Sequence, residues 1–308
     1  MARARLKQIG EQVVVITGAS SGIGLVTAKE AARRGAKVVL VARNEAALAH
    51  AVADIEAAGG TAIHVVGDVA KAGDMERVAA TAIEAFGGFD TWVNNASTTI
   101  YGRLDEVHLE DKRRMFDVVY WGVVHGCRAA LPHLKQRGGA IVNIGSVASE
   151  VALPLLGAYS AAKHAVKGYT DALRIELQHE GAPITVSLVK PASIDTMFYA
   201  HSRNYMDVDP KPVPPVYAPE LVAETILHCA EHGTRELFVG GAGRALQLMR
   251  DTAPRLMDKE LATVGIAAQR SDRPAGEAGS DNLFDFAEDG RERGGYQGHV
   301  REHSMYGV

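Results

Sequence analysis

The chain has 308 residues and a mass of 32.8 kDa; 47% of its residues are hydrophobic and 23% are charged. That supplies enough apolar material for one large α/β domain or two ordinary ones, and it excludes a collagenous or wholly disordered chain. The formal net charge of −4 gives no support to nucleic acid or an anionic membrane as the main partner.

Short runs rich in β-branched residues alternate with longer amphipathic stretches along the first 240 residues. We expect strands at 13–17, 37–42, 62–66, 91–94, 140–144, 185–189 and 236–239. We expect helices near 23–34, 45–58, 73–86, 105–136, 158–180 and 219–231. Five of them should end at a glycine: Gly35, Gly59, Gly87, Gly138 and Gly181. This order predicts an α/β fold, a single doubly wound Rossmann-type domain whose seven-stranded parallel sheet is covered on both faces.

The composition changes after residue 242, so we divide the chain into a domain at 1–242 and a C-terminal extension at 243–308. We expect residues 243–264 to form one amphipathic helix, with an apolar side made of Leu246, Met249, Leu256 and Leu261. Residues 271–308 are polar and glycine-rich, which is poor core material. Four aromatic residues are spaced through this tail: Phe284, Phe286, Tyr296 and Tyr306. The tail therefore either packs across the domain or a partner subunit, or stays free of both.

The start of the chain lacks the apolar core of a signal peptide, and no run of 18 uncharged apolar residues could span a membrane. Two cysteines, Cys127 and Cys229, are too few for a disulfide framework or a Cys-based zinc site, and we interpret them as buried small hydrophobic residues. The twelve histidines show no spacing typical of metal ligands, so no metal is expected. The default expectation is a cytoplasmic protein without a membrane span.

The first expected strand leads directly into a glycine-rich turn at 17–24 and then into a helix. Gly18 would permit the tight turn, Gly22 would let the backbone approach a pyrophosphate, and Gly24 would allow close packing of helix on strand. Free N–H groups at the helix start would bind the phosphates. The other candidate cofactor-binding residues of the turn are Ser20, Ser21 and Ile23. A purely structural turn is the alternative, while the absence of a Walker A lysine disfavours ATP or GTP.

The spacing TGxxxGxG resembles that of the short-chain dehydrogenase/reductase family, and other motifs over residues 10–240 strengthen the resemblance. The segment 94–97 (NNAS) is similar to the family's NNAG motif, which implies cofactor contacts from Asn95 and Ala96. Ser146, Tyr159 and Lys163 match the family's catalytic serine and its YxxxK pair. The resemblance implies a nicotinamide cofactor and alcohol–carbonyl chemistry.

A further segment, 190–196 (KPASIDT), stands where the family normally has a PG-x-x-x-T segment, with Ala192 in place of glycine. By the same resemblance it implies cofactor contacts from Pro191, Ile194 and Thr196.

The end of the second expected strand bears on the choice between the two nicotinamide cofactors. An NAD-preferring enzyme usually has Asp or Glu there to accept hydrogen bonds from the ribose 2′-OH, whereas this chain has Arg43 and no acid. The guanidinium of Arg43 can pair with a 2′-phosphate, so we expect NADP(H) in preference to NAD(H), with a merely solvated Arg43 as the alternative. Asp68 and Val69 resemble the family's adenine contact, although Asp68 could equally be a helix N-cap.

Tyr159 and Lys163 are four residues apart on one expected helix, so both side chains lie on one face. A free tyrosine has a pKa of about 10 and is a reluctant proton donor or acceptor at neutral pH. We expect the ammonium of Lys163, together with the positive nicotinamide of the oxidised cofactor, to lower the pKa of Tyr159. Ser146 would donate a hydrogen bond to the substrate oxygen. The resemblance also implies that Tyr159 and Lys163 contact the cofactor, Lys163 through the nicotinamide ribose.

One residue departs from the family's site. The family usually has an asparagine three residues after a Phe-Asp-Val-like opening, where it helps to hold a water that links the lysine to solvent. This chain has Val119 at that position, and its side chain cannot form a hydrogen bond. The departure puts the proton relay in doubt rather than the hydride transfer.

The segment 193–219 is long, rich in aromatic residues and proline, and without clear periodicity, which is typical of a lid over a substrate. Its composition favours an apolar or bulky carbonyl or alcohol, unless these residues simply complete the core. We interpret the chain as an NADP(H)-dependent oxidoreductase that acts on a CH–OH group and reversibly reduces a ketone or aldehyde. A catalytically silent NADP(H)-binding sensor or scaffold is the alternative, and an epimerase or dehydratase is a third. The resemblance implies a homodimer or homotetramer.

Overall fold

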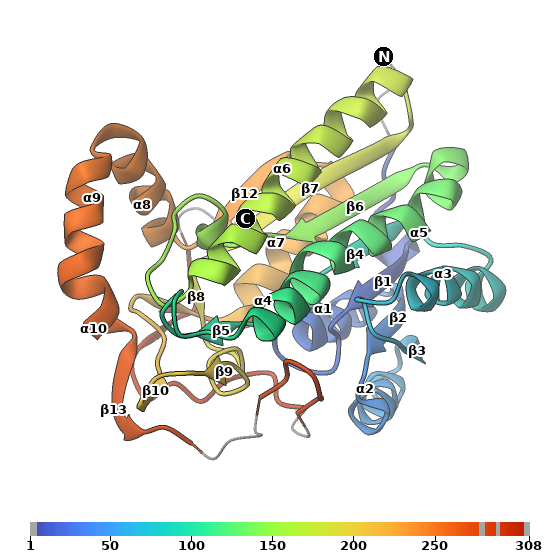
Figure 1. Cartoon of the computed structure of the whole chain (residues 1–308). Coiled ribbons are helices and arrows are strands. Elements are labelled where there is room, and N and C mark those ends of the chain that lie inside the picture. The colour runs from blue at the N-terminus through green and yellow to red at the C-terminus, as the bar shows by residue number, and fades with distance from the viewer. Residues whose placement is uncertain (1–4, 277–280, 288–289, 305–308) are drawn as a thin grey trace.

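The computed structural model describes residues 5–276, 281–287 and 290–304. Its main sheet has seven parallel strands in the order β12-β7-β6-β4-β1-β2-β3 (Figure 1). The strands are β1 (Val13–Thr17), β2 (Lys37–Ala42), β3 (Thr61–Val66), β4 (Thr91–Asn94), β6 (Gly139–Ile144), β7 (Ile184–Pro191) and β12 (Glu236–Val239). The seven-stranded parallel sheet predicted from the sequence is therefore confirmed.

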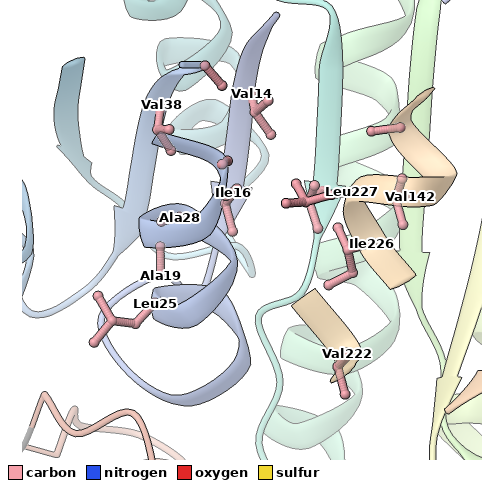
Figure 2. Close-up of a cluster of buried hydrophobic side chains, with 14 of the residues drawn as sticks. Val14, Ile16, Ala19, Leu25, Ala28, Val38, Val142, Val222, Ile226 and Leu227 are labelled. Carbon is pink, nitrogen blue, oxygen red and sulfur yellow. The ribbon is translucent and has the colours of Figure 1, made fainter. Parts of the chain in front are cut away.

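Helices cover both faces of this sheet, as a doubly wound fold requires. One face packs against α1 (Gly22–Arg33), α2 (Glu45–Ala57) and α7 (Pro219–His232). Figure 2 shows the part of this apolar cluster that lies between the strands and the helices α1 and α7. The other face packs against α3 (Ala72–Phe86), α5 (Gly122–Arg137) and α6 (Gly157–Glu180). Successive strand residues point to opposite faces, so Val14 lies in the first cluster and Val15 in the second.

Two glycines show why the helices end where the sequence indicates. Gly87 and Gly181 are the C-caps of α3 and α6, with φ of 78° and 70°. This left-handed conformation costs glycine nothing, because it has no Cβ. The backbone N–H of Gly87 donates to the carbonyl of Ile83 at 2.8 Å and so satisfies one of the free carbonyls at the helix end.

The prediction of a single helix at 105–136 is wrong in two respects. Its first turn is irregular, so α4 begins only at Leu109 (Leu109–Phe116), and a π turn (η2, Asp117–Trp121) separates α4 from α5. The π turn is closed by a hydrogen bond from the N–H of Gly122 to the carbonyl of Asp117. Such turns are rare and frequently lie at functional sites.

The expectation of one amphipathic helix at 243–264 is also wrong. The segment divides into α8 (Gly241–Thr252), α9 (Pro254–Glu260), a π turn (η4, Leu261–Gly265) and α10 (Ile266–Ala268). The break lies at Pro254, which has no N–H to continue the ladder of α8 and instead begins the next helix. The apolar side does not face a core either, since Leu256 is 59% exposed.

The described part of the tail packs across the domain, which decides between the two alternatives left open by its sequence. Short pairings join β10 (Val208–Pro210) to β13 (Arg270–Pro274), and β11 (Val216–Tyr217) to both β8 (Ser193–Ile194) and β14 (Val300–Arg301). A further two-stranded sheet joins β5 (Ile100–Tyr101) to β9 (Arg203–Asn204). Tyr306 lies outside the described residues.

Two smaller findings bear on the expectations from composition. Cys127 and Cys229 are both buried and neither forms a disulfide, as predicted. Among the described residues, no helix combines the length and the apolar character needed to cross a membrane.

Gly126 on α5 provides a test of the packing between this helix and β4. A Cβ here would lie 2.7 Å from Trp92 Nε1 and closer still to Asn94 Oδ1, two atoms that share a buried hydrogen bond. We expect Gly126→Ala to lower the free energy of unfolding by about 1–3 kcal/mol, measured by urea denaturation. The control is Gly168→Ala on α6, where a Cβ meets nothing within 4 Å and should stabilise the helix. Equal effects of the two substitutions would contradict this account of the interface.

Candidate active site

A cavity of about 190 Å³ lies at the carboxyl ends of the strands, where open α/β sheets bind their ligands. The segments that line it follow β1, β2, β3, β4 and β7. The structure brings these predicted cofactor-binding residues together around it: Gly18, Ser20, Ser21, Gly22, Ile23, Arg43, Asp68, Val69, Asn95, Ala96 and Thr196. The other predicted cofactor-binding residues do not line the cavity: Gly24, Tyr159, Lys163, Pro191 and Ile194.

The glycine-rich turn is held by hydrogen bonds from the loop after β4. The side-chain amide of Asn95 donates to the carbonyls of Thr17 (2.9 Å) and Gly18 (3.2 Å). A Cβ at Gly24 would lie 2.6 Å from that same amide nitrogen, and a Cβ at Gly18 would lie 2.7 Å from Ala96 Cα. Glycine is therefore required at both positions, and the resulting turn presents the N-terminus of α1 to the cavity. These features fit a dinucleotide pyrophosphate.

Asp68 has partners in this structure that its sequence context does not reveal. Its Oδ2 lies 2.8 Å from the Arg114 guanidinium on α4, and its Oδ1 accepts the N–H of Ala70 at 3.0 Å. The alternative that Asp68 is an N-cap is wrong, because Lys71 holds that position in α3. The ion pair with Arg114 instead fixes the loop after β3 against the helix that follows β4.

Arg43 is half-buried and forms no ion pair within the described part of the chain. Its two terminal nitrogens donate to backbone carbonyls of the C-terminal tail, Nη1 to Phe284 at 2.7 Å and Nη2 to Asn282 at 2.6 Å. The simple alternative of a solvated Arg43 is therefore wrong. The guanidinium nevertheless lines the cavity at the position expected from the sequence.

The three candidate catalytic residues lie together beside this cavity, although none of them lines it. Tyr159 and Lys163 are on α6 and only 7% and 2% exposed, and the Lys163 Nζ lies 5.6 Å from the centre of the Tyr159 ring. The hydroxyls of Ser146 and Ser97 lie beside the Tyr159 hydroxyl and act to lower its pKa. Ser97 also lines the cavity, which connects the tyrosine to the cofactor side.

The pKa values of the pair differ from what the spacing suggests. Burial raises the pKa of Tyr159 above its usual value despite the two serine hydroxyls, and burial lowers the pKa of Lys163 to about 7. The cause is the same for both, because a low-dielectric site disfavours the charged form of each group. The Lys163 ammonium donates to the carbonyl of Ile144 at 2.7 Å, and no carboxylate of the described residues shifts its pKa. Lys163 is not among the groups that shift the pKa of Tyr159 in this structure, and the contribution expected from the oxidised nicotinamide stays a prediction.

Val119 lies in the middle of the π turn and is fully buried. It packs in a third apolar cluster that also holds Tyr159. The position where the family has an asparagine is therefore apolar in this chain, but the backbone around it departs from the regular α-helical hydrogen-bond pattern.

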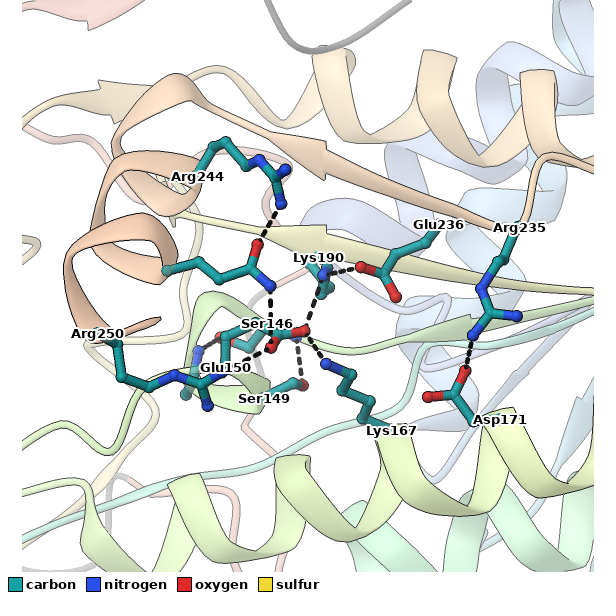
Figure 3. A network of polar contacts seen from close by, with 12 residues as sticks. Ser146, Ser149, Glu150, Lys167, Asp171, Lys190, Arg235, Glu236, Arg244 and Arg250 are labelled. Carbon is teal, nitrogen blue, oxygen red and sulfur yellow. Dashed lines mark hydrogen bonds and ion pairs between the residues drawn. The ribbon is translucent and has the colours of Figure 1, made fainter. Parts of the chain in front are cut away.

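A buried network of charges supports the turn that holds Ser146 (Figure 3). The Ser146 hydroxyl accepts the N–H of Ala148 and the Ser149 hydroxyl accepts the N–H of Ser146, which closes a 3-10 turn (η3, Val147–Ser149). Glu150 comes next, and its fully buried carboxylate pairs with the ammonium groups of Lys190 (2.8 Å) and Lys167 (2.6 Å).

The burial of Glu150 acts to raise the pKa of its carboxyl, but the two ammonium groups outweigh burial and hold that pKa below its usual value. Breaking such a pair would leave an uncompensated buried charge. Sequence reasoning missed Glu150, Ser97 and Arg114, because their partners lie on distant segments and no motif contains Glu150 or Arg114. For Ser97, the only available signal was that it replaces the glycine of the family's NNAG motif.

The substrate side of Tyr159 is apolar. The third cluster contains residues from β5, α4 and the segment 193–219, and the ring of Phe198 lies 5.4 Å from that of Tyr159 in an edge-to-face arrangement. Met197 and Phe198 line the cavity as well. The segment 193–219 thus both packs against the core and borders the site.

Comparisons with known proteins are consistent with this geometry. The chain matches the family model for short chain dehydrogenases over residues 12–206. It is 42% identical to an uncharacterized oxidoreductase, YxnA, of Bacillus subtilis, across 99% of this chain and 86% of that protein.

Two solved structures have the same fold. A short chain dehydrogenase/reductase from Burkholderia phymatum in complex with NAD superimposes with a TM-score of 0.74 at 29% identity, over 82% of this chain and 96% of that one. An alcohol dehydrogenase from Thermococcus sibiricus complexed with 5-hydroxy-NADP gives 0.66 at 27% identity, over 74% and 95%.

The lowered pKa of Lys163 predicts a pH-dependent stability. Its pKa is about 7 in the folded state, against about 10.4 for a lysine in an unfolded chain. Between these values the unfolded chain binds more protons, so the contribution of Lys163 to stability rises with pH, by at most about 1.4 kcal/mol per unit. We therefore expect the free energy of unfolding of Lys163→Met, relative to that of the wild type, to be highest at pH 7 and below. This difference should decrease toward pH 10.

Urea denaturation at pH 6, 7.5 and 9 measures this difference. The control is Lys71→Met, because Lys71 is exposed, and its effect should stay the same across the three pH values. A Lys163→Met effect that is equally independent of pH would show that the amine is not buried as described.

Proposed function

Because this chain belongs to the short-chain dehydrogenase/reductase family of oxidoreductases, we propose that it reversibly reduces a ketone or aldehyde to an alcohol with NADP(H). The observation that carries the proposal is the grouping of Ser146, Tyr159 and Lys163 beside the cavity that Arg43 lines. Ser97 and Phe198, which line the cavity, lie next to Tyr159. The fold alone would not justify the proposal, since similar folds carry many activities.

A bound nicotinamide cofactor supplies the hydride in this chemistry, and the residues of the chain position the substrate and move the proton. Ser146 donates a hydrogen bond to the substrate oxygen and holds it near the Tyr159 hydroxyl. Tyr159 is the general acid in reduction and the general base in oxidation. Its raised pKa keeps the phenol protonated at neutral pH, which is the form that donates a proton to a carbonyl oxygen.

Lys163 has two roles in this proposal. Its amine is anchored by the carbonyl of Ile144 and borders the Tyr159 ring, so in its protonated form it favours the phenolate left after proton transfer. Because its pKa is about 7, a modest change in surroundings converts it between its charged and neutral forms. By the family resemblance it also holds the nicotinamide ribose.

The preference for NADP(H) rests on Arg43. The guanidinium borders the cavity at the end of β2, where an acid would favour the 2′-OH of NAD(H). An arginine fork matches the geometry of a phosphate group, and its hydrogen bonds to an anion are stronger than those to a neutral carbonyl.

The substrate and the assembly follow from the surfaces around the site. The apolar cluster around Tyr159 favours an apolar or bulky carbonyl compound over a small charged acid.

Trp121 and Ile175 are 46% and 61% exposed and lie on the two helical segments through which related enzymes commonly pair. They support a homodimer or homotetramer.

Tyr159→Phe tests the chemistry. The substitution keeps the ring and removes the proton donor, so we expect kcat to fall by about 10²–10⁴-fold while binding of NADPH is retained. NADPH consumption against a panel of apolar ketones and aldehydes measures it, with Tyr169→Phe on the same helix as the control. A wild type that binds NADPH but turns over nothing on a broad panel would favour the silent cofactor-binding module instead.

Arg43→Ala tests the cofactor preference. Loss of the guanidinium should raise KM for NADPH by at least about tenfold, as expected for charged hydrogen bonds worth about 1.5–3 kcal/mol. KM for NADH should not rise, because NADH carries no 2′-phosphate, and so NADH serves as the internal control. Equal changes for the two cofactors would refute the assignment of NADP(H).

A further inference from the structure

The C-terminal tail crosses the mouth of the cofactor cavity. We call residues 281–287 and 290–296 the C-terminal strap; it belongs to the red segment at the foot of Figure 1. Asn282, Phe286 and Ala287 line the cavity together with the glycine-rich turn. Leu283 is fully buried in the apolar cluster that holds Tyr159, and this side chain anchors the first half of the strap.

The first half of the strap is bonded to the end of β2. Both terminal nitrogens of Arg43 donate to its carbonyls, at 2.6 and 2.7 Å, and the Asn44 side-chain amide donates to the carbonyl of Ala287 at 3.1 Å. The Arg114 guanidinium donates to the carbonyl of Leu283 at 3.0 Å. The strap therefore occupies the Arg43 guanidinium, the group that we expect to bind the 2′-phosphate of NADP(H).

The second half of the strap is bonded to the glycine-rich turn and to the segment after β7. The N–H of Gly22, at the start of α1, donates to the carbonyl of Arg291 at 2.9 Å. The N–H groups of Gly294 and Tyr296 donate to the backbone carbonyl and the side chain of Asp195, at 3.3 and 3.0 Å. The Arg291 carbonyl thus accepts the hydrogen bond that the Gly22 N–H, at the start of the helix, would donate to a pyrophosphate.

With the strap in this position, the cavity volume of about 190 Å³ is below the range of about 300–1,000 Å³ that is usual for small-molecule sites. The strap contacts are neutral carbonyl acceptors, whereas a phosphate is an anion. At Gly22 a phosphate makes the hydrogen bond charge-assisted, which is about twice as strong, and at Arg43 it adds an ion pair with bidentate geometry. A dinucleotide can therefore displace the strap from the same donors. Pairing of β13 before the strap and of β14 after it keeps the strap close to the cavity when it is displaced.

We propose that the C-terminal strap is an intramolecular competitor of the cofactor, which the phosphates must displace from Gly22 and Arg43 before the dinucleotide can bind. The proposal rests on the proposed function, because it takes the 2′-phosphate of NADP(H) as the competitor at Arg43. The strap is then a determinant of cofactor specificity: NADP(H) must displace it at both donors, and NAD(H) only at Gly22.

Loosening the strap tests this competition. Leu283→Ala weakens its apolar anchor without touching Gly22 or Arg43, so the fraction of molecules with an open cavity rises and the apparent Kd falls in proportion. We expect Kd for NADPH, measured by fluorescence titration, to fall at least about threefold. Kd for NADH should fall by a smaller factor. Leu256→Ala is the matched control, because Leu256 is exposed on α9, and it should leave both constants unchanged.

Arg293→Ala provides a second variant should Leu283→Ala fail to fold. It removes the ion pairs of the strap with Glu220 (2.9 Å) and Glu302 (3.0 Å), and we expect it to lower both constants as well. Hydrogen exchange of the wild type gives an independent readout, since saturation with NADPH should speed exchange at 290–296. An unchanged or raised Kd in the variants, or slower exchange at 290–296, would overturn the proposal in favour of a strap that closes over bound cofactor.

The two proposals fail separately. If Arg43→Ala changes NADPH and NADH binding equally, the assignment of NADP(H) is wrong, while competition at Gly22 is still measured by the Kd for NADH in Leu283→Ala. If Arg43→Ala discriminates between the cofactors but neither strap variant lowers either Kd, competition by the strap is wrong and the assignment of NADP(H) stands.

Discussion

The hydrogen bond from Lys163 to the carbonyl of Ile144 is the contact on which the candidate site depends. It fixes α6 to the carboxyl end of β6, and it holds an amine in a position where burial alone shifts the pKa. Because the same burial acts on Tyr159, both groups favour their neutral forms, and the two serine hydroxyls are the polar groups at the phenol. Burial therefore favours the protonated phenol, which is the form that the proposed general acid requires.

The rest of the fold supports that contact from both sides. The Glu150 carboxylate joins the Ser146 turn to Lys167 on α6 and to Lys190 on β7, so that three elements carrying site residues share one buried charge. Asn95 fastens the glycine-rich turn to the loop after β4. The strap then covers the cavity with contacts to the same turn and to Arg43, which links the extension to the domain that binds the cofactor.

Local sequence patterns predicted the elements that depend on periodicity and on turn chemistry. The seven strands were predicted because apolar β-branched runs are bounded by turn residues, and the helix ends because glycine tolerates positive φ. The two helix predictions that were wrong concern segments whose local pattern is compatible with more than one backbone structure. Residues 243–264 have helical periodicity, but Pro254 interrupts the backbone ladder. Residues 117–121 are helical with a wider hydrogen-bond pattern that no composition rule distinguishes.

By itself, the sequence determined the fold class, the order of the strands along the chain and the cavity-lining residues that follow β1 to β4. Those features follow from short-range spacing, because the carboxyl ends of parallel strands meet at one edge of a sheet. Only the tertiary structure decided the partners of Arg43, Asp68 and Glu150, and the direction of the pKa shifts at Tyr159 and Lys163. Those depend on burial and on contacts between segments as much as 241 residues apart, which packing of the whole chain fixes and local pattern does not.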